Sequence, residues 1–309
     1  MPKAADSSKR GQRVNRRDFI KTLAILSLGA CPFARPLLGK TPSAAPDIER
    51  ENSWAILSDS HVGDPRMEYP SFMRIIEDES IERVIHVGDA IDKPGNTDEW
   101  RRFLEITGPG KDFHLVPGNH DISGEESLRT YLALFPEPYS SFSQGDTLFL
   151  LLCTELPGEE SRIGGKQLAW VTAELQRTFR YKFVFLHEPP FPVVPFHGLD
   201  RHPSVRDRLH ELFVENGVSL VVAGHDHVYD RKEKDGVTYV IDGRTGGQPV
   251  PGGSGNGHSL CYTIATRVKD GYSFAVRGKE GEAVDRFSIN RRATGRAGPS
   301  ISDRKSDLP

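Results

Sequence analysis

The feature that most constrains this chain is a series of short apolar runs, each of which ends in a cluster of polar residues. The run from Phe113 to Val116 leads into Pro117 and Gly118, which break regular structure, and then into three side chains that can bind metals or move protons. This order is typical of a buried strand that ends in a functional loop. Five such clusters follow five separate apolar runs: Asp59-Ser60-His61, Gly88-Asp89, Gly118-Asn119-His120-Asp121, His187 and Gly224-His225-Asp226-His227.

The apolar runs alternate with helical patterns through most of the chain. The runs predict strands at 54–57, 84–87, 113–116, 147–153, 183–186, 219–223, 237–241, 260–268, 272–277 and 285–289. Apolar residues at helical spacing predict helices at 71–80, 97–106, 125–135, 165–179 and 204–216. The pattern predicts a single α/β domain with sheets inside and helices outside. Open α/β folds bind ligands at the carboxyl ends of their strands, so the five clusters should meet along one edge.

The N-terminal segment is typical of a targeting signal. Two adjacent arginines, Arg16 and Arg17, precede Phe19-Ile20-Lys21 and an apolar stretch from Leu23 to Ala30. That stretch is too short to span a membrane but has the length of a signal-peptide core. It resembles a twin-arginine export signal, which implies passage through the twin-arginine translocon to the periplasm or the outside of the cell.

The targeting segment also sets the expected domain limits. Residues 1–45 are interpreted as signal peptide and linker, 52–289 as the folded domain, and 290–309 as a polar, disordered tail. An alternative is that Leu28-Gly29-Ala30-Cys31, which resembles a lipoprotein cleavage box, would leave the protein anchored to the membrane at Cys31.

Charge and cysteine content exclude some classes of function. The net charge is −3, but the first 45 residues carry nine Lys or Arg and two Asp, a net of +7, so the rest carries −10. An acidic body argues against a general nucleic-acid-binding surface. The three cysteines show no metal-binding spacing. Cys153 and Cys261 are expected to be buried free thiols, and a disulfide between them is the alternative.

The donors gathered at the strand ends are too many for one metal ion. Imidazoles, carboxylates and an amide together can bind Zn, Fe or Mn. One ion takes roughly four to six donors, water included, so this set suggests two ions. Two cations about 4 Å apart repel strongly, and a shared carboxylate between them is therefore required. The candidate residues are Asp59, His61, Asp89, Asn119, His120, His187, His225 and His227.

The five clusters, in this order, resemble the motifs of the calcineurin-like metallophosphoesterase family. The blocks are D-x-H, G-D, G-N-H-D, H and G-H-x-H, and the similarity spans roughly residues 52–266. The resemblance implies two mixed β-sheets packed as a sandwich and flanked by helices. It also implies hydrolysis of phosphate esters of small molecules by a hydroxide that bridges two metal ions and attacks phosphorus in line.

The resemblance also implies a role for each candidate. The first metal ion would be held by Asp59, His61 and His227. The second would be held by Asn119, His187 and His225. Asp89 would bridge the two ions. His120 would not bind metal but would stabilise the transition state or protonate the leaving oxygen.

Other polar residues are expected to be structural or to support the site. His86, His114 and His210 are interpreted as core or surface histidines, and Asp226 as a residue without a catalytic part. Asp121 should make local backbone hydrogen bonds, while Asp92 could support a ligand or be a solvated loop acid. Tyr229 and Arg231 could brace the last motif. Four further residues lie in loops that could reach a substrate: His197, His202, Arg244 and His258.

The ester class stays open between two branches of the family. The Asp59-Ser60-His61 block is similar to the phosphodiesterase branch. The run from Gly224 to Arg231, with Val237-Thr238-Tyr239, also looks like the purple-acid-phosphatase branch, which lacks the first-block histidine. His61 therefore favours phosphodiesters, with phosphomonoesters as the alternative and a non-catalytic metal-binding protein as a remote one. Metal identity and oligomeric state stay open.

Overall fold

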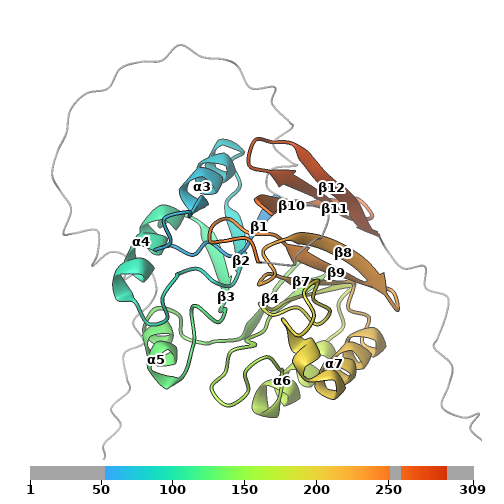
Figure 1. Cartoon of the computed structure of the whole chain (residues 1–309). Coiled ribbons are helices and arrows are strands. Elements are labelled where there is room, and N and C mark those ends of the chain that lie inside the picture. Colours follow the sequence, from blue (N-terminus) through green and yellow to red (C-terminus); the bar gives the residue numbers. More distant parts are fainter. Residues whose placement is uncertain (1–52, 251–258, 291–309) are drawn as a thin grey trace, which may run out of the picture.

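A computed structural model describes residues 53–250 and 259–290 (Figure 1). The predicted export signal, Cys31, His258 and nearly all of the predicted tail lie outside the described residues. No described helix is long and apolar enough to cross a membrane.

The first sheet has six strands in the order β12-β11-β10-β1-β2-β3. Its parallel part consists of β1 (Ser53–Leu57), β2 (Arg83–Val87) and β3 (Asp112–Val116). Its antiparallel part consists of β10 (Cys261–Val268), β11 (Gly271–Gly278) and β12 (Ala283–Asn290). The chain therefore returns at its end to pair β10 with β1, the first strand described.

The second sheet also has six strands, in the order β4-β5-β6-β7-β9-β8. Its parallel strands are β5 (Thr147–Leu151), β6 (Tyr181–Phe185), β7 (Leu220–Ala223) and β9 (Val237–Asp242). Antiparallel edge strands close both sides: β4 (Ser140–Gln144) beside β5, and β8 (Tyr229–Lys234) beside β9. The expected pair of mixed sheets is confirmed.

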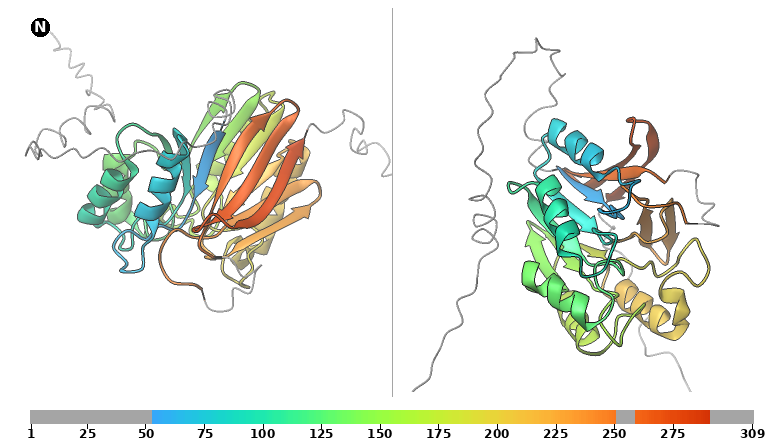
Figure 2. Two further views of the ribbon diagram at one scale, coloured as in Figure 1. Left: turned by 90° about the horizontal axis from the view of Figure 1, so that it is seen from above. Right: turned by 60° about the vertical axis from the view of Figure 1, so that its left-hand side comes forward.

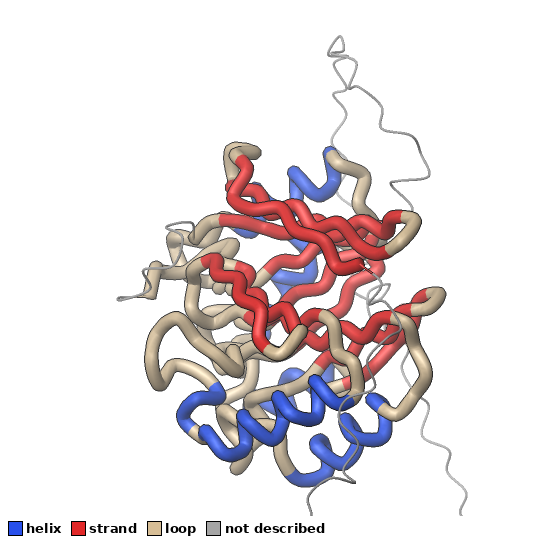
Figure 3. Tube along the Cα trace, turned by 90° about the vertical axis from the view of Figure 1, so that its right-hand side faces the viewer, coloured by secondary structure: helices blue, strands red, loops and turns tan. Residues whose placement is uncertain are grey.

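Helices cover the outer face of each sheet (Figures 2 and 3). The helices α3 (Tyr69–Asp78), α4 (Thr97–Thr107) and α5 (Glu125–Leu134) share a buried apolar core with the first sheet. The helices α6 (Gly165–Leu175) and α7 (Pro203–Glu215), with the short 3₁₀ helix η1 (Leu199–Arg201), do the same for the second sheet. In Figure 3 the helices of the second sheet lie below the strands, and those of the first sheet lie behind the uppermost strands.

The two sheets face each other across an aromatic core. Trp54 of β1 packs edge-on against Phe149 and Phe185 of the second sheet, with ring centroids 5.6 and 5.9 Å apart. The same cluster takes in Phe183 and Phe274, and all of these rings are almost fully buried. Burial of these large rings stabilises the packing of one sheet on the other, and it therefore fixes the relative positions of the strand ends.

Two strands were not predicted, and both are edge strands. The sequence of β4 is Ser-Ser-Phe-Ser-Gln and that of β8 is Tyr-Asp-Arg-Lys-Glu-Lys, so neither is an apolar run. An edge strand pairs on one side only, and charged side chains on it discourage pairing with other chains. Each is joined to its partner by a two-residue turn, Gly145-Asp146 and Asp235-Gly236. Aspartate with glycine is the hairpin signal that could have revealed both.

Cys153 and Cys261 are free and fully buried, as expected. Cys153 belongs to the core beneath α3 to α5, whereas Cys261 belongs to the core between the sheets. The alternative of a disulfide between them is wrong.

Candidate metal centre

All of the predicted donors lie at the carboxyl ends of parallel strands. Asp59 and His61 follow β1, Asp89 follows β2, and Asn119 follows β3. From the second sheet, His187 follows β6, and His225 and His227 follow β7. The expectation that the clusters meet at one edge is confirmed, because the two groups described below draw on both sheets.

The backbone at these strand ends adopts a conformation that is rare for residues other than glycine. Five of the nine described non-glycine residues with positive φ are candidate donors, with φ between 44° and 72°: Asp59, His61, Asp89, His225 and His227. Such left-handed residues are uncommon and concentrate at functional sites, where neighbouring contacts hold them. Here the amide of Asp59 donates to the carbonyl of Gly88, and the amide of His61 donates to the carbonyl of Asp89, both at 3.0 Å.

Two motif glycines permit the close approach of these loops. A Cβ atom on Gly118 would lie 2.3 Å from Oδ1 of Asp89, and one on Gly224 would lie 2.0 Å from Oγ of Ser58. No side chain fits at either distance, so glycine is required where one loop crosses another.

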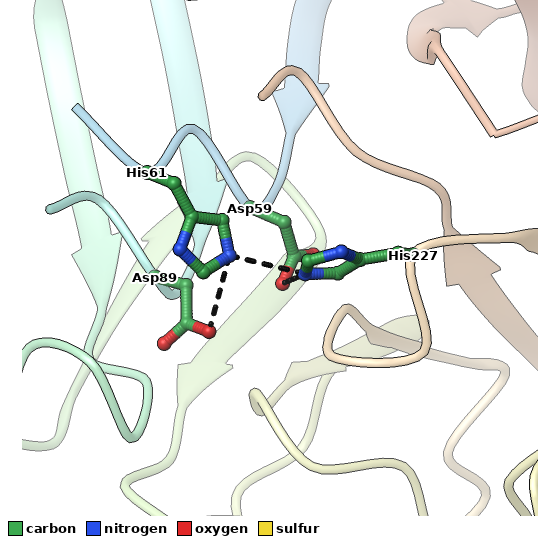
Figure 4. A group of neighbouring side chains, drawn as sticks. All are labelled: Asp59, His61, Asp89 and His227. Atoms are coloured by element: carbon green, nitrogen blue, oxygen red, sulfur yellow. Dashed lines mark hydrogen bonds and ion pairs between the residues drawn. The ribbon is translucent and has the colours of Figure 1, made fainter. Parts of the chain in front are cut away.

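The first group of donors consists of Asp59, His61, Asp89 and His227, each offering one ligand atom within 4.8 Å of the others (Figure 4). Nε2 of His61 lies 3.0 Å from Nε2 of His227 and 3.6 Å from Oδ2 of Asp89. Nε2 of His227 lies 3.2 Å from Oδ1 of Asp59. All four residues are buried.

The second group consists of Asp89, His187 and His225, again within 4.8 Å of one another. Nε2 of His187 lies 3.3 Å from Oδ2 of Asp89 and 3.2 Å from Nδ1 of His225. Oδ1 of Asn119 lies 3.2 Å from the same Nε2 of His187. Asp89 is therefore common to both groups, and we call them the first half and the second half of the centre.

The outer contacts of the histidines fit metal ligands. Nδ1 of His187 donates to the carbonyl of Val87 at 2.9 Å, and Nδ1 of His227 donates to the carbonyl of Gln248. Nδ1 of His61 lies 3.7 Å from Oδ1 of Asp92. In each case Nε2 is left to face the other donors, which is how metal-binding histidines are oriented. His225 instead directs Nδ1 inward, and its buried Nε2 lacks a hydrogen-bond partner in the described part of the chain.

The carboxylates of the centre are ionised. Burial disfavours the charge, but His227 and His187 outweigh it and lower the pKa of Asp59 to about 2. Burial likewise opposes ionisation of Asp89, yet His187 and His61 hold its pKa well below the usual range. Two buried carboxylates that keep their charge attract cations.

The histidines of the centre divide into two kinds. Burial lowers the pKa of His61, and burial together with His187 holds the pKa of His225 well below its usual value, so both stay neutral. Although burial opposes it, Asp89 raises the pKa of His187 and Asp59 raises that of His227. A bound metal ion would take the place of those protons, because ligands bind metals in their deprotonated form. The residues therefore fit a pair of metal ions.

A match to a family model shows which family the chain belongs to. The model described as the calcineurin-like phosphoesterase superfamily domain matches residues 53–256. The chain belongs to the calcineurin-like phosphoesterase superfamily. The matched residues include every donor of both halves, and the resemblance inferred from the motifs is confirmed.

Named relatives in the superfamily are phosphatases, and each is matched over part of its length. The chain is 30% identical over 146 residues to the serine/threonine-protein phosphatase CPPED1 of Bos taurus, which covers 42% of this chain and 46% of the bovine protein. It is 26% identical over 174 residues to the phosphoenolpyruvate phosphatase of Allium cepa, which covers 50% of this chain and 35% of the onion protein. The matched stretch is thus less than half of either relative.

A solved structure shares the fold. The purple acid phosphatase PPD1 from yellow lupin (Lupinus luteus) seeds has a TM-score of 0.64 and 18% sequence identity, and the match covers 78% of this chain and 54% of the lupin chain. At this identity the likeness shows the fold alone.

His120, at the rim of this superfamily centre, is held by its backbone and one ring nitrogen. Its amide donates to Oδ1 of Asp89 at 2.9 Å, and its Nδ1 donates to the carbonyl of Asp92 at 2.5 Å. The ring meets that of His61 edge-on, with centroids 4.6 Å apart. Ligand atoms of His120, His61 and Asp92 lie within 4.8 Å of one another, so His120 stands beside the first half without belonging to it.

Asp121 holds the turn that carries His120, as the sequence suggested. Oδ2 of Asp121 accepts the amide of Gly118 at 2.9 Å, and Oδ1 accepts the amides of Ala90 and Ile91 at 3.0 and 3.2 Å. Burial and the nearby Asp89 raise the pKa of Asp121 to about 7 in spite of these bonds. The residue links the ends of β2 and β3 and therefore the positions of Asp89 and His120.

The three histidines interpreted as structural all lie outside the two halves. His86 is buried in β2, where Oγ of Ser60 contacts its Nε2. His114 stacks on Phe142 at 4.0 Å, and His210 contacts the hydroxyl of Tyr239 and Oδ2 of Asp235.

Three of the loop residues that could reach a substrate are described, and of these His197 lies against the ring of a metal-ligand candidate. The ring of His197 stacks on that of His225, with centroids 4.1 Å apart. Nη1 of Arg244 instead donates to the carbonyls of Gly246 and Gly247, both at 2.9 Å, and braces that loop. His202 precedes the first turn of α7.

Two buried acids beside the centre were not predicted. Glu155 follows β5, and Glu188 follows His187; both are almost fully buried. Burial and Glu188 raise the pKa of Glu155 to about 8. Oε1 of Glu188 accepts from Oγ of Ser161 at 3.0 Å. The signal was available, since Thr154-Glu155 directly follows an apolar run, as the recognised clusters do.

Tyr229 and Arg231 tie the strand that follows the last motif to the other sheet. The hydroxyl of Tyr229 and Nε of Arg231 both donate to Oδ2 of Asp285, at 2.8 and 2.6 Å. They join β8 of the second sheet to β12 of the first.

Proposed function

We propose that this chain is a phosphoester hydrolase that works with two metal ions. Asp59, His61 and His227 would hold the first ion, and Asn119, His187 and His225 the second. Asp89 would contact both. One observation carries the proposal: Oδ2 of Asp89 lies 3.6 Å from Nε2 of His61 and 3.3 Å from Nε2 of His187, so a single carboxylate oxygen joins the two halves.

The donor set suits Zn, Fe or Mn. When bound, such a pair of ions makes water a nucleophile near neutral pH and offsets the charge that builds on the phosphoryl oxygens. The protein orients these donors through the outer contacts of His61, His187 and His227, and it excludes bulk water by burying them.

His120 would handle the proton of the leaving group. Because Nδ1 of His120 donates to the carbonyl of Asp92, Nε2 is the ring nitrogen that remains to meet a substrate. With a proton on both ring nitrogens, His120 would give the one on Nε2 to the ester oxygen as the bond from that oxygen to phosphorus breaks. The products would be an alcohol and a phosphate group, and the ring would then regain a proton from water.

Two classes of ester are candidates. The first-block histidine, His61, favours phosphodiesters. The phosphatase names of the curated relatives favour phosphomonoesters, although those relatives are matched over less than half of their length.

Turnover of an aryl phosphomonoester and of an aryl phosphodiester by the purified, metal-replete protein tests both the activity and its class. The proposal expects hydrolysis of at least one ester, abolished by a chelator and restored by metal. The preference for diesters expects a diester rate at least comparable to the monoester rate. Absence of turnover of either ester by protein that contains metal would refute the proposed activity, and pure monoesterase activity would refute only the preference.

We further propose that the protein is exported through the twin-arginine translocon as a folded domain, to the periplasm or the outside of the cell. Support comes from Arg16 and Arg17 before a short apolar stretch, and from the advantage of loading metal before export. A membrane anchor at Cys31 is the alternative, and the division into 1–45, 52–289 and 290–309 stays a prediction. Cell fractionation of the protein with Arg16→Lys and Arg17→Lys checks this: the variant should remain inside the cell, and unchanged export would contradict the proposal.

A further inference from the structure

The loop from Pro189 to Pro203, between β6 and α7, is tied to the metal centre by one buried residue. Oδ2 of Asp226 accepts the amides of Val193 and Val194 at 2.6 and 3.3 Å. Oδ1 of Asp226 accepts from Nδ1 of His197 at 2.7 Å. Asp226 is fully buried, and both of its oxygens are used by the loop. In the sequence it stands between His225 and His227, so it fixes the loop relative to one ligand candidate of each half.

The far part of the loop is held separately by its own carboxylate. Asp200 accepts the amide of Phe196 at 2.6 Å through Oδ2 and the amide of Gly198 at 3.1 Å through Oδ1. The amide of Leu199 donates to the carbonyl of Pro189 at 3.0 Å, which closes the loop on itself. His197 therefore lies in a segment held on both sides.

The ring of His197 is stacked on the second half of the centre. Its centroid is 4.1 Å from that of His225, the two planes are inclined by 21°, and the side chain of His197 is 27% exposed. Because Nδ1 donates to Asp226, Nε2 is the nitrogen left to meet a substrate, and no residue in 53–250 or 259–290 forms a hydrogen bond with it.

The two halves thus each have one adjoining histidine that belongs to neither donor group. His120 meets His61 of the first half, and His197 stacks on His225 of the second. A phosphate ester bound between the halves would have its leaving oxygen near one ring and its remaining oxygens within reach of the other. The two histidines differ in the group to which Nδ1 donates. For His197 this is the carboxylate of Asp226, and for His120 it is the backbone carbonyl of Asp92.

We propose that His197 binds the oxygen that distinguishes a phosphomonoester from a phosphodiester, and that Asp226 is the residue that positions it. In a monoester this oxygen is free: Nε2 accepts from it when it is a hydroxyl, or donates to it when it is an oxyanion and the ring is charged. In a diester the same oxygen carries a second substituent, which removes that hydrogen bond and meets the imidazole ring. The inference rests on the proposed function, and it concerns the ratio of the two activities, whichever ester the wild type prefers.

The test is the ratio of kcat/KM for an aryl phosphomonoester to that for the matching aryl phosphodiester, with metal content measured for every variant. His197→Ala should lower the monoester value by about tenfold to a hundredfold, the usual cost of a hydrogen bond to a charged group. The diester value should change by less than about threefold. A ratio that does not change would overturn the proposal.

Asp226→Asn tests the positioning role, because an amide keeps the shape but cannot accept from both the loop amides and His197. It should shift the ratio in the same direction as His197→Ala. In the variant that carries both substitutions, the ratio should match that of His197→Ala alone. If the effects of the two substitutions on the ratio multiply instead, Asp226 does not act through His197. This result would overturn its part of the proposal. If Asp226→Asn also loses metal, its positioning role is rejected, since the residue would then be needed by the centre itself.

Asp200→Asn is the matched control, because Asp200 accepts amides of the same loop and makes no contact with the ring of His197 among the contacts described. It should leave the ratio unchanged. A shift as large as that of Asp226→Asn would mean that any loosening of the loop changes the ratio, and the specific role of Asp226 would fall. Absence of activity in the wild type would instead refute the proposed function, so the two failures are distinct.

Discussion

The first half of the metal centre contains two carboxylates, Asp59 and Asp89, whereas the second half has only the shared Asp89. The donors particular to the second half, Asn119, His187 and His225, include no carboxylate. A cation in the first half therefore meets more fixed negative charge, and it should be held more strongly than one in the second. The difference follows from the sheets, because both carboxylates come from loops of the first sheet and the second sheet contributes histidines alone.

Removal of the shared carboxylate should have the largest effect. Asp89→Ala should leave less than about one metal ion per chain and lower kcat/KM for any accepted ester by at least about a thousandfold, since several kcal/mol of transition-state stabilisation are lost. Elemental analysis and steady-state kinetics measure the two effects.

His225→Ala is the counterpart that affects one half only. It should keep about one ion per chain, bound in the first half, because both carboxylates remain there. A variant at Asp89 that kept two ions, or one at His225 that lost both, would show that the halves are not built as proposed.

Loss of the proton-donating His120 should have a smaller effect on activity. It should also show that His120, at the rim, differs in role from the metal ligands. His120→Ala should lower kcat by about a hundredfold to ten-thousandfold, the usual contribution of general acid catalysis, while metal content stays that of the wild type. Loss of metal in His120→Ala would instead make His120 a ligand, together with His61 and Asp92, whose ligand atoms lie within 4.8 Å of one another.

The smallest expected effect is on the pH dependence of stability. It concerns His86, which lies in β2 behind the first half of the centre. Burial lowers its pKa to about 3, against 6.5 for the free side chain, in spite of the attraction of Asp59 and Asp89. The unfolded chain takes up a proton here below pH 6.5 and the folded chain does not, so stability is complete above pH 6.5 and falls as the pH drops toward 3.

Urea unfolding of the wild type and of His86→Leu at pH 7 and pH 5 measures this effect. Between these values the wild type should lose about 2 kcal/mol more of its unfolding free energy than the variant does. Equal losses would show that His86 is charged or exposed in the folded protein. Replacement of His114 is a suitable control, because His114 lies in β3 of the same sheet and is not buried.

Much of the fold and the candidate site could be predicted because both depend on local patterns. Strands such as β5 and β6 are buried on both faces, so they appear as continuous apolar runs. Metal donors at the carboxyl ends of strands such as β6 appear as polar residues directly after those runs. Edge strands β4 and β8 have no such run, because packing does not demand one there.

The role of Asp226 could not be predicted from local pattern. The sequence indicated only that Asp226, unlike His225 and His227, is not a metal-ligand candidate. What its side chain contacts depends on the path of a loop that begins at Pro189, nearly forty residues earlier. The same holds for Glu188, whose neighbours are Ser161, from the loop between β5 and α6, and Arg201, from η1. Contacts between irregular segments leave little periodic signal in sequence.

The central claim is that one carboxylate, Asp89, joins two metal sites. The most direct test is the metal content of the wild-type protein, purified after expression with Mn, Fe and Zn supplied, by elemental analysis. The account predicts about two ions per chain. Fewer than about one ion per chain would contradict it.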